Sequence, residues 1–429
     1  MSKNEAKLNQ EMLVLRKDQA PRTGANLSQS EPKGQEAGYA VPQLLEELKV
    51  EIFCRVSCFD YWKMQFLNKQ VMQLLKTGEI FRMRRKHGLV KPYVLIHSGG
   101  ETCWTMFDKD FENFGKLPTI PSDDGCFFYG DKETISAGAQ LIVIGREVEG
   151  IVVWRYELES HKWFKGPAII TPKVMYGSAS RGTDAFFAGG IKVDENGIYE
   201  VVNTLEKYNA DTKMWTVLHG MHKRRKFSSG CFLHGKFYVV GGRDENDKNL
   251  TCGERYDEVT NSWELIPNML KDMTLTSSQS PPLIAVVDNN LYLLETSLNE
   301  LCIYDINANA WKKLGVLPVR ANAALGWGVA FKSIGDRLLV IGPSSSQSWH
   351  RTTAVYTCWS FSRCGRAILE GIKTFSQLCP SPPVYPKLLR DVCLSVFLRR
   401  TWKHTLFVFA FFYVCVYNKF AASLMPKHN

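Results

Sequence analysis

Motifs that mark common enzyme classes and zinc-binding domains are missing from this 429-residue sequence. It has no GxSxG, HExxH or Walker motif, and no GxGxxG motif follows an expected strand. Its twelve cysteines include no CxxC pair, so the spacing of a zinc site is lacking. The N-terminus has no apolar stretch of signal-peptide length. These absences favour a non-catalytic protein of the nucleus or cytoplasm, with reduced cysteines and with no cofactor or metal.

The net charge of +10 belongs almost entirely to the C-terminal part of the sequence. Residues 351–429 contain eleven Lys or Arg and two acidic residues, a balance of 11 − 2 = +9, which leaves 10 − 9 = +1 for the first 350 residues. A body this close to neutral does not favour nucleic-acid binding. Two basic clusters, at 82–87 and 222–226, are interpreted as exposed charged surface, and nuclear import remains an alternative for the second.

Four Tyr–Trp pairs with the same seven-residue spacing indicate a long repeat. Successive Trp residues are 52, 48 and 48 positions apart, and an apolar run precedes each Tyr and recurs after the last Trp. A repeat near 50 residues with buried aliphatic strands is typical of a β-propeller blade. The rings are expected to fill the space between neighbouring sheets, with their N–H and O–H groups bonded to backbone. The repeat residues are Tyr156, Trp163, Tyr208, Trp215, Tyr256, Trp263, Tyr304 and Trp311, with Gly145, Gly189, Gly190, Gly241, Gly242 and Gly342 near the ends of the apolar runs.

Two segments before the repeat have different compositions. Residues 1–40 contain few large apolar groups and are expected to form a flexible lead. In residues 41–90 apolar side chains, among them Phe66 and Leu67, recur at three- and four-residue steps. That spacing predicts three short helices, each with one apolar face.

The glycine doublets and Tyr-x6-Trp pairs resemble kelch repeats, and the helical segment before them resembles an F-box. This order, together with local stretches at 85–89, 131–133 and 322–331, is similar to the plant F-box/kelch-repeat family. The resemblance implies a mainly β fold, in which a kelch-type β-propeller of about six blades follows a small all-α F-box-like module. In that family the F-box docks a Skp-type adaptor on a cullin scaffold, and the propeller presents the protein to be ubiquitinated.

The resemblance also implies which residues contact these partners. An F-box usually opens with Leu-Pro and has a second proline a few residues later, whereas this segment has only the first proline. Loops at 194–200 and 243–249 are expected to contact the recruited protein, whose identity is unknown. The expected adaptor-binding residues are Pro42, Leu44, Leu45, Leu48, Ile52 and Val56.

Two other functions remain open. One is a kelch-repeat interaction scaffold that does not assemble into a ubiquitin ligase. The other is a kelch-type copper-radical oxidase, whose Tyr, His and Cys ligands converge on one face. The nine His residues form no ligand-like cluster in the sequence, which gives the oxidase little support.

The repeat pattern stops after Gly342, where no further Tyr-x6-Trp pair follows. We therefore expect a propeller over residues 91–350 whose last blade is incomplete, and an irregular basic tail over residues 351–429. The twelve-residue apolar run at 406–417 is short of the roughly 20 residues that a membrane-spanning helix needs. It is interpreted as an unpaired, aggregation-prone segment, and a membrane anchor is disfavoured.

Overall fold

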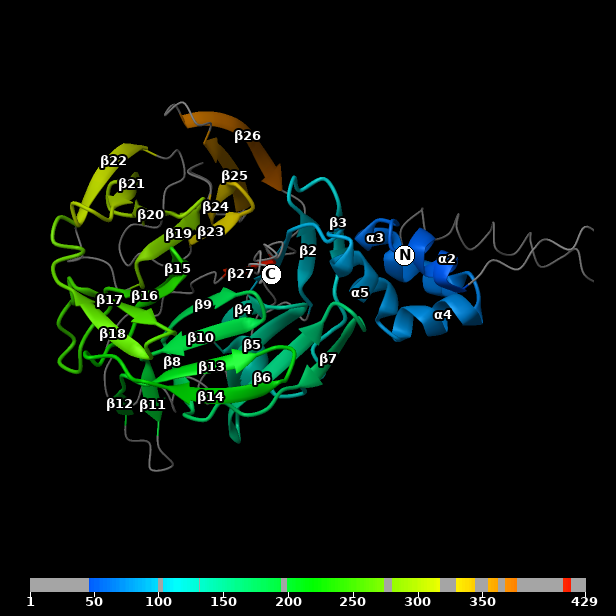
Figure 1. Cartoon of the computed structure of the whole chain (residues 1–429), viewed down its shortest axis with the longest axis horizontal. Coiled ribbons are helices and arrows are strands. Elements are labelled where there is room, and N and C mark those ends of the chain that lie inside the picture. The colour runs from blue at the N-terminus through cyan, green and yellow to red at the C-terminus, as the bar shows by residue number, and fades with distance from the viewer. Residues whose placement is uncertain are drawn as a thin grey trace, which may run out of the picture. The chain divides into compact units, whose positions relative to one another are not determined.

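The computed structural model describes residues 46–98, 103–130, 132–193, 199–273, 280–316, 329–343, 354–361, 367–375 and 412–417. The described residues begin with a helical segment (Figure 1). It consists of α2 (Glu46–Phe53), α3 (Cys58–Tyr61), the 3-10 helix η1 (Trp62–Phe66), α4 (Lys69–Lys76) and α5 (Glu79–Lys86).

The helical segment has its own small core, which consists of Val50, Cys54, Met64, Val71, Leu75 and Ile80. Asn68 starts α4, because its side chain accepts a hydrogen bond from the N–H of Val71, one of the groups that a helix start leaves unpaired. Phe66 is the last residue of η1, Leu67 lies between η1 and α4, and both side chains are exposed. The expectation that these two residues belong to a packed helix face is therefore wrong.

Six four-stranded antiparallel sheets make up most of the described residues (Figure 1). We name them blades 1 to 6 in chain order. Blade 1 contains β1 (Tyr93–Ser98), β2 (Thr105–Asp108) and β3 (Phe114–Lys116), and blade 2 contains β4 (Glu133–Ala137), β5 (Gln140–Glu147), β6 (Gly150–Glu157) and β7 (Lys162–Lys165). Blade 3 contains β9 (Gly177–Arg181), β10 (Asp184–Ala188), β13 (Leu205–Asn209) and β14 (Met214–Leu218).

The remaining blades repeat this arrangement. Blade 4 contains β15 (Ser229–Leu233), β16 (Lys236–Val240), β17 (Gly253–Asp257) and β18 (Ser262–Ile266). Blade 5 contains β19 (Leu283–Val287), β20 (Asn290–Glu295), β21 (Glu300–Asp305) and β22 (Ala310–Val316). Blade 6 contains β23 (Ala330–Ile334), β24 (Arg337–Pro343), β25 (Ala354–Phe361) and β26 (Ala367–Phe375). The short helix α6 (Gly125–Tyr129) precedes blade 2, and β8 (Lys173–Val174), β11 (Ile191–Val193) and β12 (Tyr199–Val201) form a small extra sheet.

The apolar runs of the sequence are strands buried on both faces. In β5, Leu141 and Val143 pack in the cluster shared with blade 1, whereas Ile142 and Ile144 pack in the cluster shared with blade 3. Successive side chains of a strand point to opposite faces, so a strand between two packed neighbours is apolar at every position. The continuous runs therefore follow from the stacking of each blade between two others.

The blades close into a ring through their inner strands. These strands contact one another in the cyclic order β27, β4, β9, β15, β19, β23 and back to β27. Here β27 (Phe412–Tyr417) is the inner strand of blade 1, where it pairs with β1 along the whole of that strand. The fold is thus the mainly β propeller that the repeat predicts.

The expected incomplete sixth blade and irregular tail are wrong for the described residues. β25 pairs with β24 and β26 pairs with β25, so residues beyond 350 supply half of blade 6. Residues 412–417 of the apolar run, expected to be unpaired, form β27. Strand pairing uses the N–H and C=O groups that almost every residue carries, so these strands need no repeat motif. The expected flexible lead at 1–40 lies outside the described residues.

Candidate interaction surfaces

The four Tyr–Trp pairs join neighbouring blades. In blades 2 to 5 the two residues are direct cross-strand partners on the third and fourth strands, and their ring centroids lie 5.0–5.3 Å apart. Each Trp Nε1 donates a hydrogen bond of 2.7–3.0 Å to a carbonyl in the segment that follows the preceding blade. These four carbonyls belong to Pro118, Pro167, His219 and Met269.

The glycine doublets of blades 3 and 4 stand where the chain leaves the second strand. Gly190 and Gly242 have φ of +101° and +92°, in the region that favours glycine. A Cβ at Gly242 would also lie 2.6 Å from the carbonyl oxygen of Lys226, in the connection that enters blade 4. Gly145 and Gly342 differ, because they lie inside β5 and β24, and blade 5 has Glu295-Thr296 at the doublet position.

The same two blades each contain a fully buried ion pair. Lys173 Nζ lies 3.4 Å from Glu206 Oε1, and Arg225 Nη2 lies 2.5 Å from Glu254 Oε1. Burial lowers the pKa of Lys173 to about 8 despite the nearby Glu206 carboxylate. The expectation of exposed surface is therefore wrong for Arg225 of the cluster at 222–226, and it is also wrong for Arg84 of the cluster at 82–87, which is buried. The reason is that Arg225 ties the incoming connection to the third strand of its own blade.

Blades 3 and 4 carry extra structure beyond their doublets. In blade 3, β11 pairs with both β8 and β12 to form the small sheet. In blade 4 the equivalent segments form only the bridges Lys226–Arg243 and Arg243–Asn249. Blade 5 turns at once from β20 to β21, because the Glu295 carboxylate accepts hydrogen bonds from the N–H groups of Ser297 and Leu298. Blade 5 therefore has only a short turn after its second strand, where blade 4 has a longer loop.

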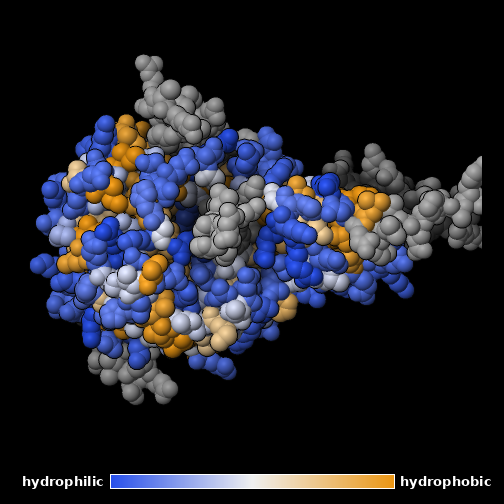
Figure 2. Space-filling view, in the orientation of Figure 1, coloured by the Kyte–Doolittle hydropathy of each residue, from blue (hydrophilic) through white to orange (hydrophobic). Residues whose placement is uncertain are grey.

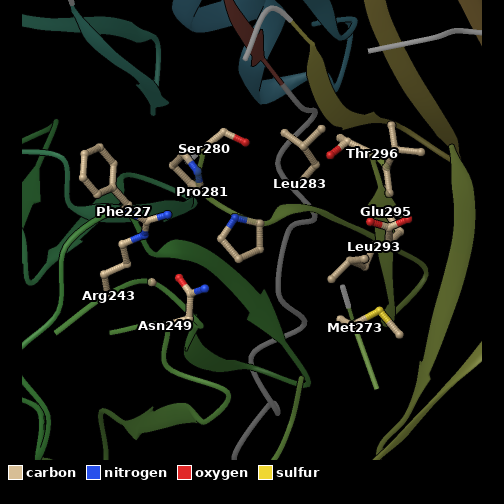
Figure 3. A pocket seen from close by; sticks show the side chains of 13 residues that line it. Phe227, Arg243, Asn249, Met273, Ser280, Pro281, Leu283, Leu293, Glu295 and Thr296 are labelled. Atoms are coloured by element: carbon tan, nitrogen blue, oxygen red, sulfur yellow. The ribbon is translucent and has the colours of Figure 1, made fainter. Parts of the chain in front are cut away.

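A hollow lies at this step between blades 4 and 5. We call it the blade 4–5 hollow. Figure 3 shows Phe227, Arg243 and Asn249 on one side and Glu295 with Thr296 on the other. Pro281, Pro282, Leu283 and Leu293 supply apolar lining. The expected contact loop at 243–249 thus contributes its two ends to the hollow, whereas 194–198 of the other expected loop lie outside the described residues.

A second surface lies on α2, where Leu48 and Ile52 are 47% and 48% exposed. They are one helical turn apart, while Val50 and Cys54 of the same segment are buried in the helical core. We call Leu48 and Ile52 the α2 face, and Figure 2 shows hydrophobic surface over the helical segment. Of the other expected adaptor-binding residues, Val56 is partly buried against the helical core. Pro42, Leu44 and Leu45 lie outside the described residues.

The helical segment contacts the first two blades. The Phe59 and Tyr93 rings meet edge to face, with their centroids 5.9 Å apart. Phe81 of α5 belongs to the same apolar cluster as Tyr93. Arg85 Nη1 lies 3.9 Å from Glu159 Oε1 of blade 2, and burial raises the pKa of that carboxyl. These contacts join α3 and α5 to blades 1 and 2.

The described residues contain no three His, Cys, Asp or Glu side chains placed to hold a metal ion. Within the same part of the chain, no helix has both the length and the apolarity that crossing a bilayer requires. Burial raises the pKa of the Cys54 and Cys302 thiols, and it raises that of Cys231 to about 12. These thiols stay protonated near neutral pH, the form that is a poor nucleophile.

Comparison with known proteins connects these features to a family. The family described as "Kelch motif" matches residues 224–270, which contain blade 4. F-box/kelch-repeat protein At3g27150 of Arabidopsis thaliana is 60% identical over 317 residues, which cover 74% of this chain and 75% of the relative. The chain belongs to the F-box/kelch-repeat family. F-box/kelch-repeat protein At1g26930 of the same plant is 37% identical over 72% of this chain and 74% of its own length, and At1g74510 is 33% identical over 74% and 72%.

Sequence reasoning missed three features of this F-box/kelch-repeat protein. Phe107 and Phe114 of blade 1 are cross-strand partners with centroids 5.9 Å apart, and their seven-residue spacing is the signal that could have identified them as a fifth aromatic pair. The buried ion pairs have a weaker signal, since Glu206 and Glu254 each stand two positions before the repeat Tyr. The blade 4–5 hollow has none, because it depends on how two unlike loops stand side by side.

Proposed function

We propose that this F-box/kelch-repeat protein is a non-catalytic, substrate-recruiting subunit of an SCF-type cullin ubiquitin ligase. In this proposal the helical segment binds a Skp-type adaptor, which connects it to the cullin scaffold. The propeller binds the protein to be ubiquitinated. Membership of the family and the presence of two separate candidate surfaces, one on the helices and one on the propeller, support this division.

The α2 face is the observation that carries the proposal. Leu48 and Ile52 are about half exposed, although a helix this short is stabilised mainly by burying its apolar side chains. Two aliphatic groups one turn apart are a common way for a helix to enter a hydrophobic groove of a partner. Val50 and Cys54 on the other side hold α2 to the helical core, so the α2 face can be covered without unfolding the segment.

The proposed mechanism is proximity. An adaptor that binds both the ligase scaffold and the target raises the effective concentration of the target's lysines near the activated ubiquitin. This works best when the distance between the two bound proteins varies little. The contacts of Phe59 with Tyr93 and of Arg85 with Glu159 support such a fixed spacing, because they join the helical segment to blades 1 and 2.

The test is binding of the full chain to a purified Skp-type adaptor, measured by biolayer interferometry. Leu48→Asp should lower the affinity at least about 30-fold, since a central interface residue contributes about 2 kcal/mol or more. Val217→Asp is the matched control, because Val217 is an exposed aliphatic residue on the outer strand β14 of the propeller. It should bind like the unmodified chain.

Two results would overturn the proposal. Equal loss in both variants would show that the α2 face is not the binding surface. Failure of the unmodified chain to bind any Skp-type adaptor would favour the alternative, a kelch-repeat scaffold that does not assemble into a ubiquitin ligase.

A further inference from the structure

The outer edge of blade 3 lacks the charged residues that the outer edges of its neighbours carry. A strand at the edge of a sheet has unpaired N–H and C=O groups, and proteins commonly place charged side chains there to prevent pairing with another chain. In blades 1, 2, 4 and 5 the outer strands β3, β7, β18 and β22 each contain exposed Lys or Glu residues, namely Lys116, Lys162, Lys165, Glu264, Lys312 and Lys313. The outer strand of blade 3, β14, reads Met-Trp-Thr-Val-Leu and has no charged residue.

The side chains of β14 are unusually exposed for their apolar character. Met214 is 64% exposed and Val217 is 56% exposed, and Thr216 between them is exposed as well. Among the described strands β14 pairs only with β13, so its other edge is free (Figure 1). Trp215 contacts Tyr208 and donates a hydrogen bond to the carbonyl of Pro167, which holds the strand in place. A partner therefore meets a strand that is already ordered, and little conformational entropy is lost on binding.

The sequence of β14 is symmetric about Thr216. If two copies of the strand pair antiparallel with Thr216 opposite Thr216, Trp215 of one copy lies opposite Val217 of the other, and Met214 lies opposite Leu218. Aromatic residues opposite β-branched residues, and Thr opposite Thr, are cross-strand pairs that stabilise antiparallel sheets. Such a pairing uses the same surface of both copies and is complete with two chains. The strand is thus complementary to itself.

The lysines beside β14 are already paired within the chain. Lys213, which precedes the strand, has its Nζ 3.2 Å from Glu157 Oε1. Lys207 is the cross-strand partner of Thr216 on β13, and its Nζ lies 2.7 Å from Glu258 Oε1. Two copies can therefore bring their β14 strands together without placing uncompensated lysines against each other.

We propose that β14 pairs with β14 of a second copy of this chain, so that two four-stranded sheets join across a two-fold axis at Thr216. A pairing over five residues is a small interface, so the dimer is weak and reversible. Each dimer presents every binding surface of the chain twice, which raises its avidity for a partner that also has two sites. This inference is independent of the proposed function, because it concerns β14 and not the α2 face.

The experiment is analytical ultracentrifugation of the full chain from about 1 µM to about 300 µM, a range in which a weak interface becomes populated. The average mass of the unmodified chain should rise toward that of two chains. Thr216→Lys and Thr216→Glu each place two like charges opposite each other, so each should weaken the dimer at least about fivefold. Ser262→Lys is the control, because Ser262 is exposed on the outer strand β18 of blade 4, and it should change the dimer less than about twofold.

A mixture of the two Thr216 variants keeps the test decisive if either substitution disturbs β14. An equal mixture places an introduced Lys opposite an introduced Glu, so it should dimerise at least about fivefold more tightly than either variant alone. The proposal fails if the mixture gains nothing, or if Ser262→Lys loses as much as the Thr216 variants. A monomer at every concentration also overturns it, and would leave the edge of β14 to a strand from another protein.

Val217→Asp separates this inference from the proposed function. It should abolish the dimer, because Val217 lies opposite Trp215 of the second copy, yet it should bind the Skp-type adaptor as the unmodified chain does. Leu48→Asp should do the reverse. Failure of one proposal therefore leaves the other standing.

Discussion

Replacing Arg225 by Met tests whether the buried ion pair of blade 4 holds the connection in place. The guanidinium donates hydrogen bonds to the carbonyls of Gly241 and Cys252 and to the Glu254 carboxylate. Met keeps a similar stem but leaves Glu254 with hydrogen bonds from the backbone N–H groups of His222 and Lys223. Removing one partner of a fully buried pair costs about 3–5 kcal/mol, because the other charge stays buried and uncompensated.

The neighbouring residue provides a matched control for this prediction. Arg224 Nη1 lies 3.0 Å from Glu200 Oε1, and both side chains are about half exposed, so Arg224→Met should cost less than about 1 kcal/mol. Urea titration followed by tryptophan fluorescence gives the free energy of unfolding for both variants. If the two losses agree within about 1 kcal/mol, the buried pair does not have the role assigned to it here.

Three further predictions concern stability. Burial lowers the pKa of His161 from 6.5 to about 4, so the unfolded chain binds one more proton than the folded chain between these values, and stability should fall as the pH drops from 6.5 to 4. His161→Asn, which has the residue type of Asn261 and Asn309, should make the melting temperature fall less between pH 7 and pH 4. An equal fall in both proteins would show that His161 does not cause the pH dependence. Gly242→Ala should lower the free energy of unfolding in urea titrations by about 2–5 kcal/mol, because its Cβ would lie 2.6 Å from a carbonyl oxygen. Gly235→Ala should lower it by only about 1–2 kcal/mol, because Gly235 also has a positive φ (+79°) but its Cβ would have no neighbouring side chain or backbone within 4 Å. Equal losses in the two variants would refute the steric argument. A chain that stops after residue 411 lacks β27, so it should melt at a lower temperature and aggregate through the free edge of β1. A chain that stops after Tyr417 keeps β27 and should melt as the full chain does. Identical melting temperatures of the two shortened chains would show that β27 does not close the ring.

Blades 2 to 5 were predictable because each one meets the same packing requirement. A Tyr on the third strand and a Trp on the fourth contact each other and the preceding blade, so their seven-residue spacing recurs along with the geometry. Blade 1 meets the requirement with Phe107 and Phe114, and the spacing persists although the residue types change. Spacing was therefore a more reliable guide than residue identity.

Other features depend on contacts that a linear pattern does not contain. The run at 222–226 has the composition of exposed surface, yet Arg225 is fully buried because it forms an ion pair with Glu254 on β17. Around α2 the three- and four-residue steps include both Leu48 and Ile52, but Val50 of α2 and Cys54 just after it are the residues buried in the helical core. Which side of a short helix is buried depends on its neighbours, which the spacing of apolar residues alone does not specify.

The pairing of β27 with β1 has a consequence for how the protein is made. Residues 99–411 separate the two strands, which amounts to 411 − 98 = 313 residues. At a translation rate of about 5–20 residues per second, β27 is synthesised roughly 15–60 s after β1. During that interval the nascent protein presents an unpaired strand edge on β1, the kind of surface that is prone to aggregate until the ring closes.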